Sequence, residues 1–405
     1  MIDGLSAPFE AEVAEAALPE ARSRRALRTP PATSSAPLRQ VAAPPLLPLP
    51  RAPAPHAQDL AACREAIRHG SRSFHAASRL LPRRVREPAL ALYAFCRCAD
   101  DAVDEEADEA AAKARAVQSL RARLDLVYEA RPQDHPADRA MAAIVERFEM
   151  PRALPEALIE GLEWDAQGRT YETLDDLHAY AARVAGAVGA MMTVLMGVRR
   201  PEALARACDM GNAMQLTNMA RDVGEDARAG RLFLPKSWLR EVGIDPAEFL
   251  ADPRFTPELG GLVERMLAEA DRLYARARPG VGQLPAVCRP AIHAAGRIYG
   301  EIGAVVRAQG CDSVSARAVT TTRRKLALAG RAMGDAAWSL APGMPKGSTA
   351  PALPACAFLV EAAARPTPPR IRASTGADAQ VSAFIAVLSD LEARDRARRD
   401  ARRAV

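Results

Sequence analysis

Apolar residues recur every three or four positions through most of the chain, which is the period of an α-helix. Runs of β-branched residues, which favour strands, are few. The pattern therefore predicts an all-α protein. Helices are expected over 59–70, 83–106, 109–129, 137–148, 152–166, 173–198, 201–226, 256–278, 285–309 and 312–335, with another opening at Ser71 and an irregular region at 235–254.

The two ends of the chain have a different character. Nine prolines fall between Pro30 and Pro55, a density that is incompatible with helix or sheet. Residues 1–57 are therefore expected to be a disordered Pro/Ala-rich extension, and 58–340 a single all-α domain. Residues 341–405 begin rich in Pro and Thr and end in a highly charged run, so they are predicted to be a linker and a tail.

Composition narrows the class of protein. A net charge of +5 over 405 residues, with basic and acidic residues interleaved, does not suggest a nucleic-acid partner. The longest apolar run, Val184 to Val198, is shorter than the roughly 20 residues that span a bilayer. Seven scattered cysteines without a secretory pattern are typical of reduced thiols, so we expect a cytoplasmic protein with at most peripheral membrane contact.

One polar stripe stands out in the helix expected at 201–226. Gln215, Asn218, Asp222 and Asp226 follow one another at spacings of three, four and four, which places them on one helical face. Carboxylate and amide oxygens are ligands that suit Mg²⁺, with Mn²⁺ as a possible substitute. A solvated acidic face is the simpler alternative. Gly224 and Gly230 are expected to loosen the end of this helix.

The helix expected at 83–106 repeats the pattern. Asp100 and Asp104 are also one turn apart, and Arg97 precedes them by one turn. An Arg97–Asp100 surface ion pair is the alternative explanation. Two facing carboxylate rows would repel each other unless cations lay between them, and a diphosphate would supply further oxygens. Arg97, Arg221 and Arg317 are basic candidates to hold such a polyanion.

Two other features each have two explanations. Ser71 and Ser73 open a helix, where free N–H groups bind phosphate, but serine is also a common N-cap. Gly186 and Gly189 lie among alanines in the helix expected at 173–198. Such small residues leave room for an apolar ligand or, more commonly, for close packing of another helix.

Four segments together resemble the squalene/phytoene synthase family of head-to-head prenyltransferases. They are SRSF (71–74), YAFCRCADDAVDE (93–105), YAARVAGAVG (180–189) and QLTNMARDVGEDARAGRLFLP (215–235). The resemblance extends over about 58–335. It implies a single-domain helical bundle of the isoprenoid synthase type, with the two aspartate helices facing each other across a central cavity.

The resemblance also implies roles for individual residues. The metal ligands would be Asp100, Asp104, Asn218, Asp222 and Asp226. The substrate would be bound by Ser71, Ser73, Tyr93, Arg97, Gln215, Asn218, Arg221 and Arg317, and the catalytic residues would be Tyr180, Tyr299, Arg97, Asp100 and Asp222. A tryptophan that related enzymes often carry after Tyr299 is missing, which weakens the match at Arg317.

The motifs are most similar to those of the phytoene-forming branch of the family. That branch implies a Mg²⁺-dependent transferase that joins two geranylgeranyl diphosphates through prephytoene diphosphate to phytoene, in its 15-cis form, at the first committed step of carotenoid biosynthesis. A C30 sibling using farnesyl diphosphate and making squalene-type, dehydrosqualene or hydroxysqualene products is the alternative. A non-catalytic scaffold of the same fold is more remote, because both aspartate motifs are intact. No nicotinamide cofactor is expected.

Further expectations follow from the product and the substrate length. A C40 hydrocarbon suggests peripheral attachment to the inner face of the membrane and transfer to a phytoene desaturase. Ala77 and Ser78 are small, so they are expected to leave the floor of the cavity open for a C20 chain.

Overall fold

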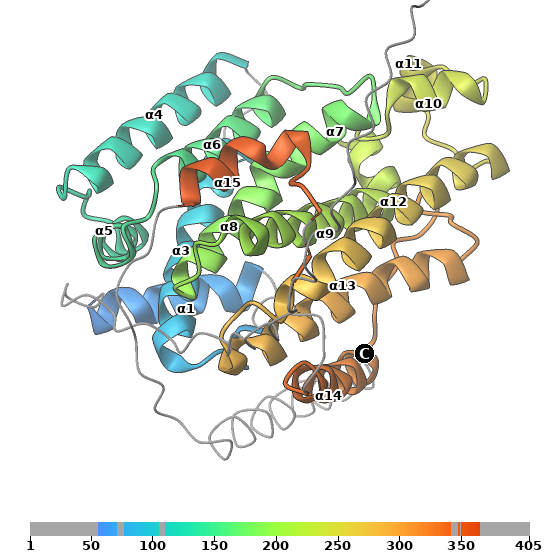
Figure 1. Ribbon diagram of the computed structural model, residues 1–405. Helices are drawn as coiled ribbons and strands as arrows, with labels where there is room; N and C mark the ends of the chain where they lie inside the picture. Colours follow the sequence, from blue (N-terminus) through green and yellow to red (C-terminus); the bar gives the residue numbers. More distant parts are fainter. Residues whose placement is uncertain (1–55, 71–76, 105–109, 342–346, 349, 365–405) are drawn as a thin grey trace, which may run out of the picture. The chain divides into compact units, whose positions relative to one another are not determined.

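The computed structural model describes residues 56–70, 77–104, 110–341, 347–348 and 350–364. The extension and the charged tail expected at the two ends lie almost wholly outside these residues. Every regular element in the described part of the chain is a helix, so the predicted all-α class is confirmed (Figure 1).

The described α-helices are close to those expected from the apolar period. They are α1 (Ala57–Gly70), α3 (Arg83–Asp104), α4 (Ala110–Tyr128), α5 (Pro136–Phe148), α6 (Ala153–Ala166), α7 (Leu174–Ala181), α8 (Ala187–Leu195), α9 (Pro201–Arg228), α10 (Lys236–Glu241), α11 (Pro246–Ala251), α12 (Pro257–Val281), α13 (Arg289–Ala308), α14 (Thr322–Trp338) and α15 (Ala357–Ala363). α10 and α11 are short helices inside the region expected to be irregular.

The helix expected at 173–198 contains a change of winding. α7 begins at a capping box, in which Thr173 and Asp176 satisfy each other's backbone N–H groups. A π-helical turn, Ala182–Gly186, then leads into α8. Such turns shift the side chains that follow around the helix axis and are frequent at functional sites. Here the π turn lies within the small-residue motif.

α9 is the central helix of the packed body. It packs against α8, α12 and α13, and in Figure 1 it runs through the middle of these helices. One apolar cluster gathers α3, α5, α6 and α8, and a second gathers α9 and α12. Met210 of α9 packs against both clusters, so α9 joins the two halves of the core.

Glycines allow α8 and α9 to cross with their backbones in close contact. A Cβ atom at Gly189 would lie 2.4 Å from the carbonyl oxygen of Ala207, and one at Gly211 would lie 2.3 Å from that of Ala185. A Cβ at Gly186 would lie 2.9 Å from the side-chain oxygen of Asn212. A Cβ atom does not fit against backbone at such distances, so close helix packing requires glycine at Gly189 and Gly211. Ala185 and Gly189 also line an apolar cavity, so both explanations of this motif apply.

The prediction of a single helix over 312–335 is wrong. α13 ends at a left-handed pair, Gly310 (φ +69°) and Cys311 (φ +59°). The Asp312 carboxylate then accepts hydrogen bonds from the backbone N–H groups of Val314 (3.0 Å) and Ser315 (2.8 Å), which closes a turn instead of a helix. α14 begins only after Thr321, whose side chain caps it.

Residues 350–364, part of the segment treated as a linker, contain a helix that packs on the core. Leu359 and Ala363 of α15 are fully buried, as is Cys356 just before it. The guanidinium groups of Arg206 and Arg276 donate to the carbonyl oxygen of Pro351, at 3.1 and 2.8 Å. Burial of the apolar residues on one side of this short segment stabilises a helix despite the prolines around it.

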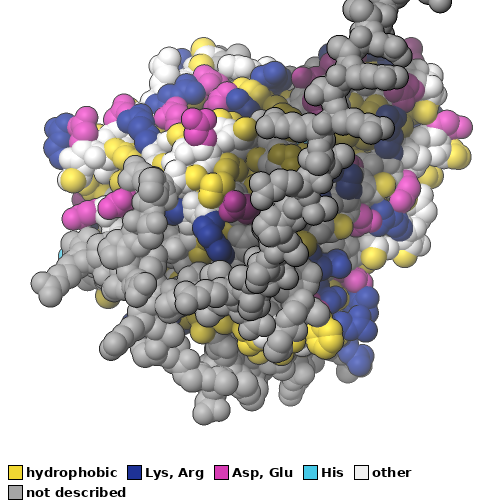
Figure 2. All heavy atoms as spheres, in the orientation of Figure 1, with side chains coloured by type: hydrophobic (Ala, Val, Ile, Leu, Met, Phe, Trp, Pro, Cys, Tyr) yellow, Lys and Arg dark blue, Asp and Glu magenta, His cyan; other side chains and the backbone are white. Residues whose placement is uncertain are grey.

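On the face seen in Figure 2, the coloured basic and acidic side chains are interspersed with one another and with hydrophobic ones. Within the described ranges, no helix combines the length and the apolar character that crossing a bilayer requires.

We predict that Gly211→Ala destabilises the protein, whereas Gly261→Ala does not. Alanine normally stabilises a helix relative to glycine by about 1 kcal/mol, and a Cβ at Gly261 of α12 meets nothing within 4 Å. At Gly211 the same methyl group forces α8 and α9 apart, an overpacking cost of about 1–3 kcal/mol. Thermal unfolding should show Tm lowered by several degrees for Gly211→Ala only. Equal Tm values for the two variants would contradict the close crossing.

Candidate functional site

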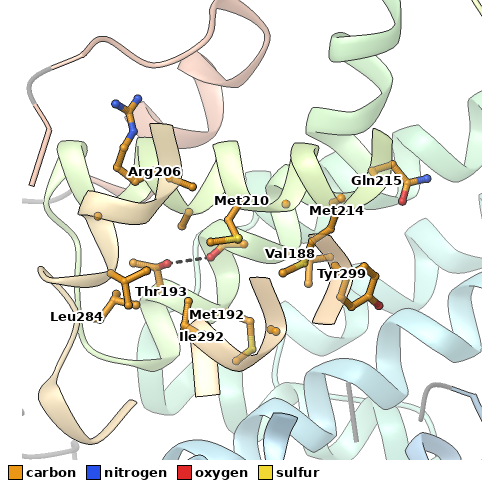
Figure 3. A pocket seen from close by; sticks show the side chains of 18 of the residues that line it. Val188, Met192, Thr193, Arg206, Met210, Met214, Gln215, Leu284, Ile292 and Tyr299 are labelled. Atoms are coloured by element: carbon orange, nitrogen blue, oxygen red, sulfur yellow. Dashed lines mark hydrogen bonds between the residues drawn. The ribbon is translucent and has the colours of Figure 1, made fainter. Parts of the chain in front are cut away.

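An apolar cavity of about 240 Å³ lies among α8, α9, α12 and α13, with Val184 and Ala185 of the π turn at its wall. α9 contributes a row of residues spaced three or four apart, and Figure 3 shows side chains from several helices converging on the space. The lining residues include Val188, Met192, Met196, Ala203, Ala207, Met210, Met214, Gln215, Asn218, Val281, Leu284, Ile292 and Tyr299.

The two ends of the cavity differ in their polar groups. Gln215 and Tyr299 lie at one end in Figure 3, which we call the polar end. Leu284 and Ile292 lie toward the other, where the polar groups of Arg206 and Thr193 are already bonded to Asp209 and Gly189. Asn218, one turn beyond Met214 on α9, also lines the cavity. Asp222 and Asp226 continue the same helical face beyond Asn218. The carboxylates therefore stand past the polar end, with apolar surface extending from them.

Asp222 is held by two arginines. The Arg221 guanidinium donates to its carboxylate at 2.7 Å, and Arg317, far along the chain, donates at 2.7 and 3.3 Å. Burial by itself raises the pKa of Asp222, but the hydrogen bonds from Arg221 and Arg317 outweigh it and hold that pKa below its usual value. Asp222 is therefore ionised at neutral pH, with two cationic groups beside it.

Gly224 allows the loop that carries Arg317 to pack close to Asp222. A Cβ at Gly224 would lie 2.6 Å from the backbone of Val314, and the N–H of Gly224 donates to the carbonyl oxygen of Ser313 at 2.9 Å. Of the two glycines expected to loosen the end of the helix, Gly230 (φ +72°) does lie just past that end, but Gly224 does not, because α9 continues to Arg228. Gly224 instead receives the loop that carries Arg317.

Asp226 has a different electrostatic environment. Burial raises its pKa to about 6, with smaller contributions from the negative charges of Asp222 and Glu225, while hydrogen bonds from Arg231 oppose the rise. The side chain is 13% exposed. A buried carboxylate beside two others is a site that an additional cation would stabilise.

These residues fit a divalent metal by the chemistry of their donors. Asn218, Asp222 and Asp226 offer amide and carboxylate oxygens on successive turns of one helix, and Mg²⁺ binds such hard ligands. Among the described side chains, no three carboxylates, histidines or cysteines form a complete cluster. The side chains of Asp100 and Asp104, the other expected metal ligands, lie outside the described residues, as do Ser71 and Ser73.

The aspartate helix α3 shows part of the expected arrangement. Arg97 donates to Asp101 at 3.1 Å, one turn further along the helix. Tyr93 is half-buried one turn before Arg97 and packs against the core.

The two expected tyrosines occupy different places. Tyr299 lines the cavity at its polar end. Tyr180 is 4% exposed; its hydroxyl donates to Asp165 at 2.6 Å, and its ring packs with Tyr171 and Phe233. Tyr180 is not among the described residues of the cavity lining. Its partner Asp165 could not have been recognised from the sequence pattern.

Some cavity residues were missed by sequence reasoning, and others were misplaced. Met210 and Met214 line the cavity, and their spacing of four on the face of Asn218 was a signal that could have found them. Ala77 and Ser78 are 5% and 3% exposed, and neither is among the described lining residues. The expected open floor at these two residues is not seen in the described cavity.

The chain is similar to known proteins over most of its length. The squalene/phytoene synthase family model matches residues 67–325. A phytoene synthase of Cereibacter sphaeroides is 57% identical over 345 residues, which cover 84% of this chain and 95% of that protein. A phytoene synthase of Rhodobacter capsulatus is 60% identical over 307 residues, covering 76% and 90%.

Solved structures support the same fold. A dehydrosqualene synthase in complex with a ligand is 31% identical with a TM-score of 0.62, over 68% of this chain and 96% of that one. A squalene synthase of Alicyclobacillus acidocaldarius, at 24% identity and a TM-score of 0.58, covers 62% and 94% and supports the fold alone. The predicted fold is thereby confirmed, and the chain belongs to the squalene/phytoene synthase family.

Proposed function

We propose that this protein condenses two molecules of geranylgeranyl diphosphate head to head, through prephytoene diphosphate, to 15-cis-phytoene, the first committed step of carotenoid biosynthesis. The observation that carries the proposal is the single face of α9. That face lines an apolar cavity from Ala203 to Asn218 and continues into Asp222 and Asp226. A prenyl diphosphate has the same division into an apolar chain and a charged head.

The described residues bind and orient the two parts of the substrate. The prenyl chain lies against Met210, Met214 and Val188, which exclude water from the allylic cation formed when diphosphate leaves. Gln215 and Asn218 orient the head at the polar end. Arg221 and Arg317 stabilise the leaving diphosphate by charge-assisted hydrogen bonds.

Mg²⁺, held by Asn218, Asp222 and Asp226 together with Asp100 and Asp104, would neutralise the negative charge that develops on the leaving diphosphate. Asp226, with a pKa of about 6, is ionised above that pH and available as a ligand. Tyr299 presents its ring at the polar end of the cavity, where its π face stabilises a passing carbocation. Tyr180 is buried, and its hydroxyl donates to Asp165 outside the cavity lining.

The C40 product is favoured over a C30 product because the relatives named phytoene synthase share 57% and 60% identity with this chain, against 31% for the dehydrosqualene synthase. The C30 reaction from farnesyl diphosphate is the second candidate, since that solved structure shares the fold. A non-catalytic scaffold would have no need for the buried Asp226, which is costly to keep ionised.

The proposal includes a cytoplasmic enzyme attached peripherally to the inner face of the membrane, which would pass phytoene to a desaturase. Trp338 and Leu340, at the end of α14, are 67% and 57% exposed. Exposed aromatic and apolar side chains of this kind favour binding to a lipid surface. No nicotinamide cofactor and no nucleic acid take part.

The direct test is product analysis. Purified protein incubated with Mg²⁺ and equal concentrations of geranylgeranyl and farnesyl diphosphate should convert the C20 substrate to phytoene in preference to the C15 substrate. Chromatography against authentic C40 and C30 standards distinguishes the products. Preferential formation of a C30 hydrocarbon would replace the proposal by the second candidate.

Asp222→Asn should lower the rate of product formation at least about a hundredfold without unfolding the protein, because it removes a negative ligand while keeping the shape. The matched control is Glu202→Gln, which makes the same chemical change at an exposed position in the first turn of α9. Steady-state rates and helical circular dichroism should be measured for both. Comparable rates in the two variants would show that Asp222 is not at the reacting centre.

Mg²⁺ should raise Tm of the wild-type protein and raise that of Asp226→Asn much less. A ligand present at 100 times its Kd stabilises the folded state by about 2.7 kcal/mol, which corresponds to several degrees. Differential scanning fluorimetry at pH 7.5, titrated with MgCl₂ and compared with NaCl of equal ionic strength, measures the effect. An identical Mg²⁺ response in both proteins would remove Asp226 from the metal site.

A further inference from the structure

A second cavity, of about 400 Å³, lies among α12, α13 and α14 and is distinct from the apolar one. α13 separates the two, with Ile292 and Tyr299 lining the apolar cavity and His293 and Arg297 lining the second one. Met210 and Val281 belong to both linings. Nothing in the proposed reaction uses this second cavity, which none of the four resembling segments reaches.

The charges around the second cavity do not balance. Its lining includes four arginines and three carboxylates. Each carboxylate already has an arginine partner: Asp335 with Arg297 at 2.7 Å, Glu301 with Arg324 at 2.6 Å, and Asp271 with Arg307, outside the lining, at 2.9 Å. Two positive charges remain in the lining.

Those two charges belong to Arg278 and Arg331. Neither forms an ion pair with any carboxylate of the described residues. Arg278 lies in the last turn of α12 and Arg331 in the middle of α14, so they approach the cavity from two different helices. The dark-blue side chains gathered at the lower right of Figure 2, in the region where Figure 1 places α14, show the basic character of this part of the surface.

His293 is a neutral polar residue in the wall of this cavity. Burial, together with the positive charges of Arg297 and Arg278, lowers the pKa of His293, and the negative charge of Asp335 opposes this shift. Its Nε2 atom is buried and has no hydrogen-bond partner among the described residues. The arginines of the lining are therefore the groups that select an anion.

We propose that this cavity is a binding site for a phosphate-type anion, held by Arg278 and Arg331 and lined by His293. Guanidinium groups suit phosphate oxygens because their N–H donors form paired, charge-assisted hydrogen bonds. The volume admits inorganic diphosphate or the phosphate end of a nucleotide. Because Met210 and Val281 also line the apolar cavity, an anion bound here lies one side chain away from the prenyl-binding space.

The test uses the full-length protein without Mg²⁺, in EDTA, so that the proposed metal-dependent site does not dominate binding. Isothermal titration with inorganic diphosphate, and separately with ADP, should show a saturable site in the wild type. Arg278→Gln combined with Arg331→Gln should weaken it at least about tenfold. Arg323→Gln, an exposed arginine on α14 outside the cavity lining, is the matched control and should bind as the wild type does.

NMR of the histidine rings supplies a readout specific to this cavity. The chain has six histidines, and the His293 signal is assigned by its loss in His293→Gln. Diphosphate or ADP should shift this signal in the wild type and not in the double arginine variant. A response to both probes identifies the phosphate group as the feature recognised, and a response to ADP alone identifies a nucleotide. Unchanged affinity in the double variant, or a His293 signal that neither probe moves, would overturn the proposal.

Discussion

The close crossing of α8 and α9 is the constraint on which the rest of the structure depends. Where Gly189 meets the backbone at Ala207 and Gly211 meets that at Ala185, the two helices approach more closely than side chains allow. This contact fixes the rotation of α9 about its own axis. Because side chains on one helix keep a constant angular relation, the same rotation directs Met210 and Met214 into the cavity and places the acidic residues at its end.

The acidic end of α9 shows how burial and pairing together prepare a site for chemistry. Asp222 is kept ionised by Arg221 and Arg317, whereas Asp226 carries a pKa raised to about 6. Two carboxylates one turn apart thus differ in how much they gain from an added cation. In the proposed reaction, the arginines beside Asp222 are also suited to a departing diphosphate.

α13 divides two spaces of opposite character with one helix. Its apolar face completes the apolar cavity, and its polar face closes the cavity with excess positive charge. Met210 lies between them, and a methionine side chain adapts its shape more readily than a branched one. An anion bound in one cavity could therefore change the shape of the other by shifting the side chain of Met210.

The apolar period alone was sufficient to predict the all-α class and most helices, because burial of one helical face is a local property of the sequence. The stripe from Gln215 to Asp226 was equally readable, since residues three and four apart share a face wherever the helix is placed. The prediction of one helix over 312–335 was wrong because the backbone forms turns at Gly310, Cys311 and Asp312, so the helix begins later than the apolar pattern indicates.

Contacts between distant residues were decided only by the tertiary structure. Arg317 and Asp222 are separated by 95 positions in the sequence. Nothing in either segment indicates that the backbone of Ser313 and Val314 packs against Gly224. The second cavity likewise requires α12, α13 and α14 to meet. Sequence by itself determined which groups lie along one helical face, because that depends on the helical repeat. Which faces oppose each other depends on the packing of whole helices, and only the folded chain sets it.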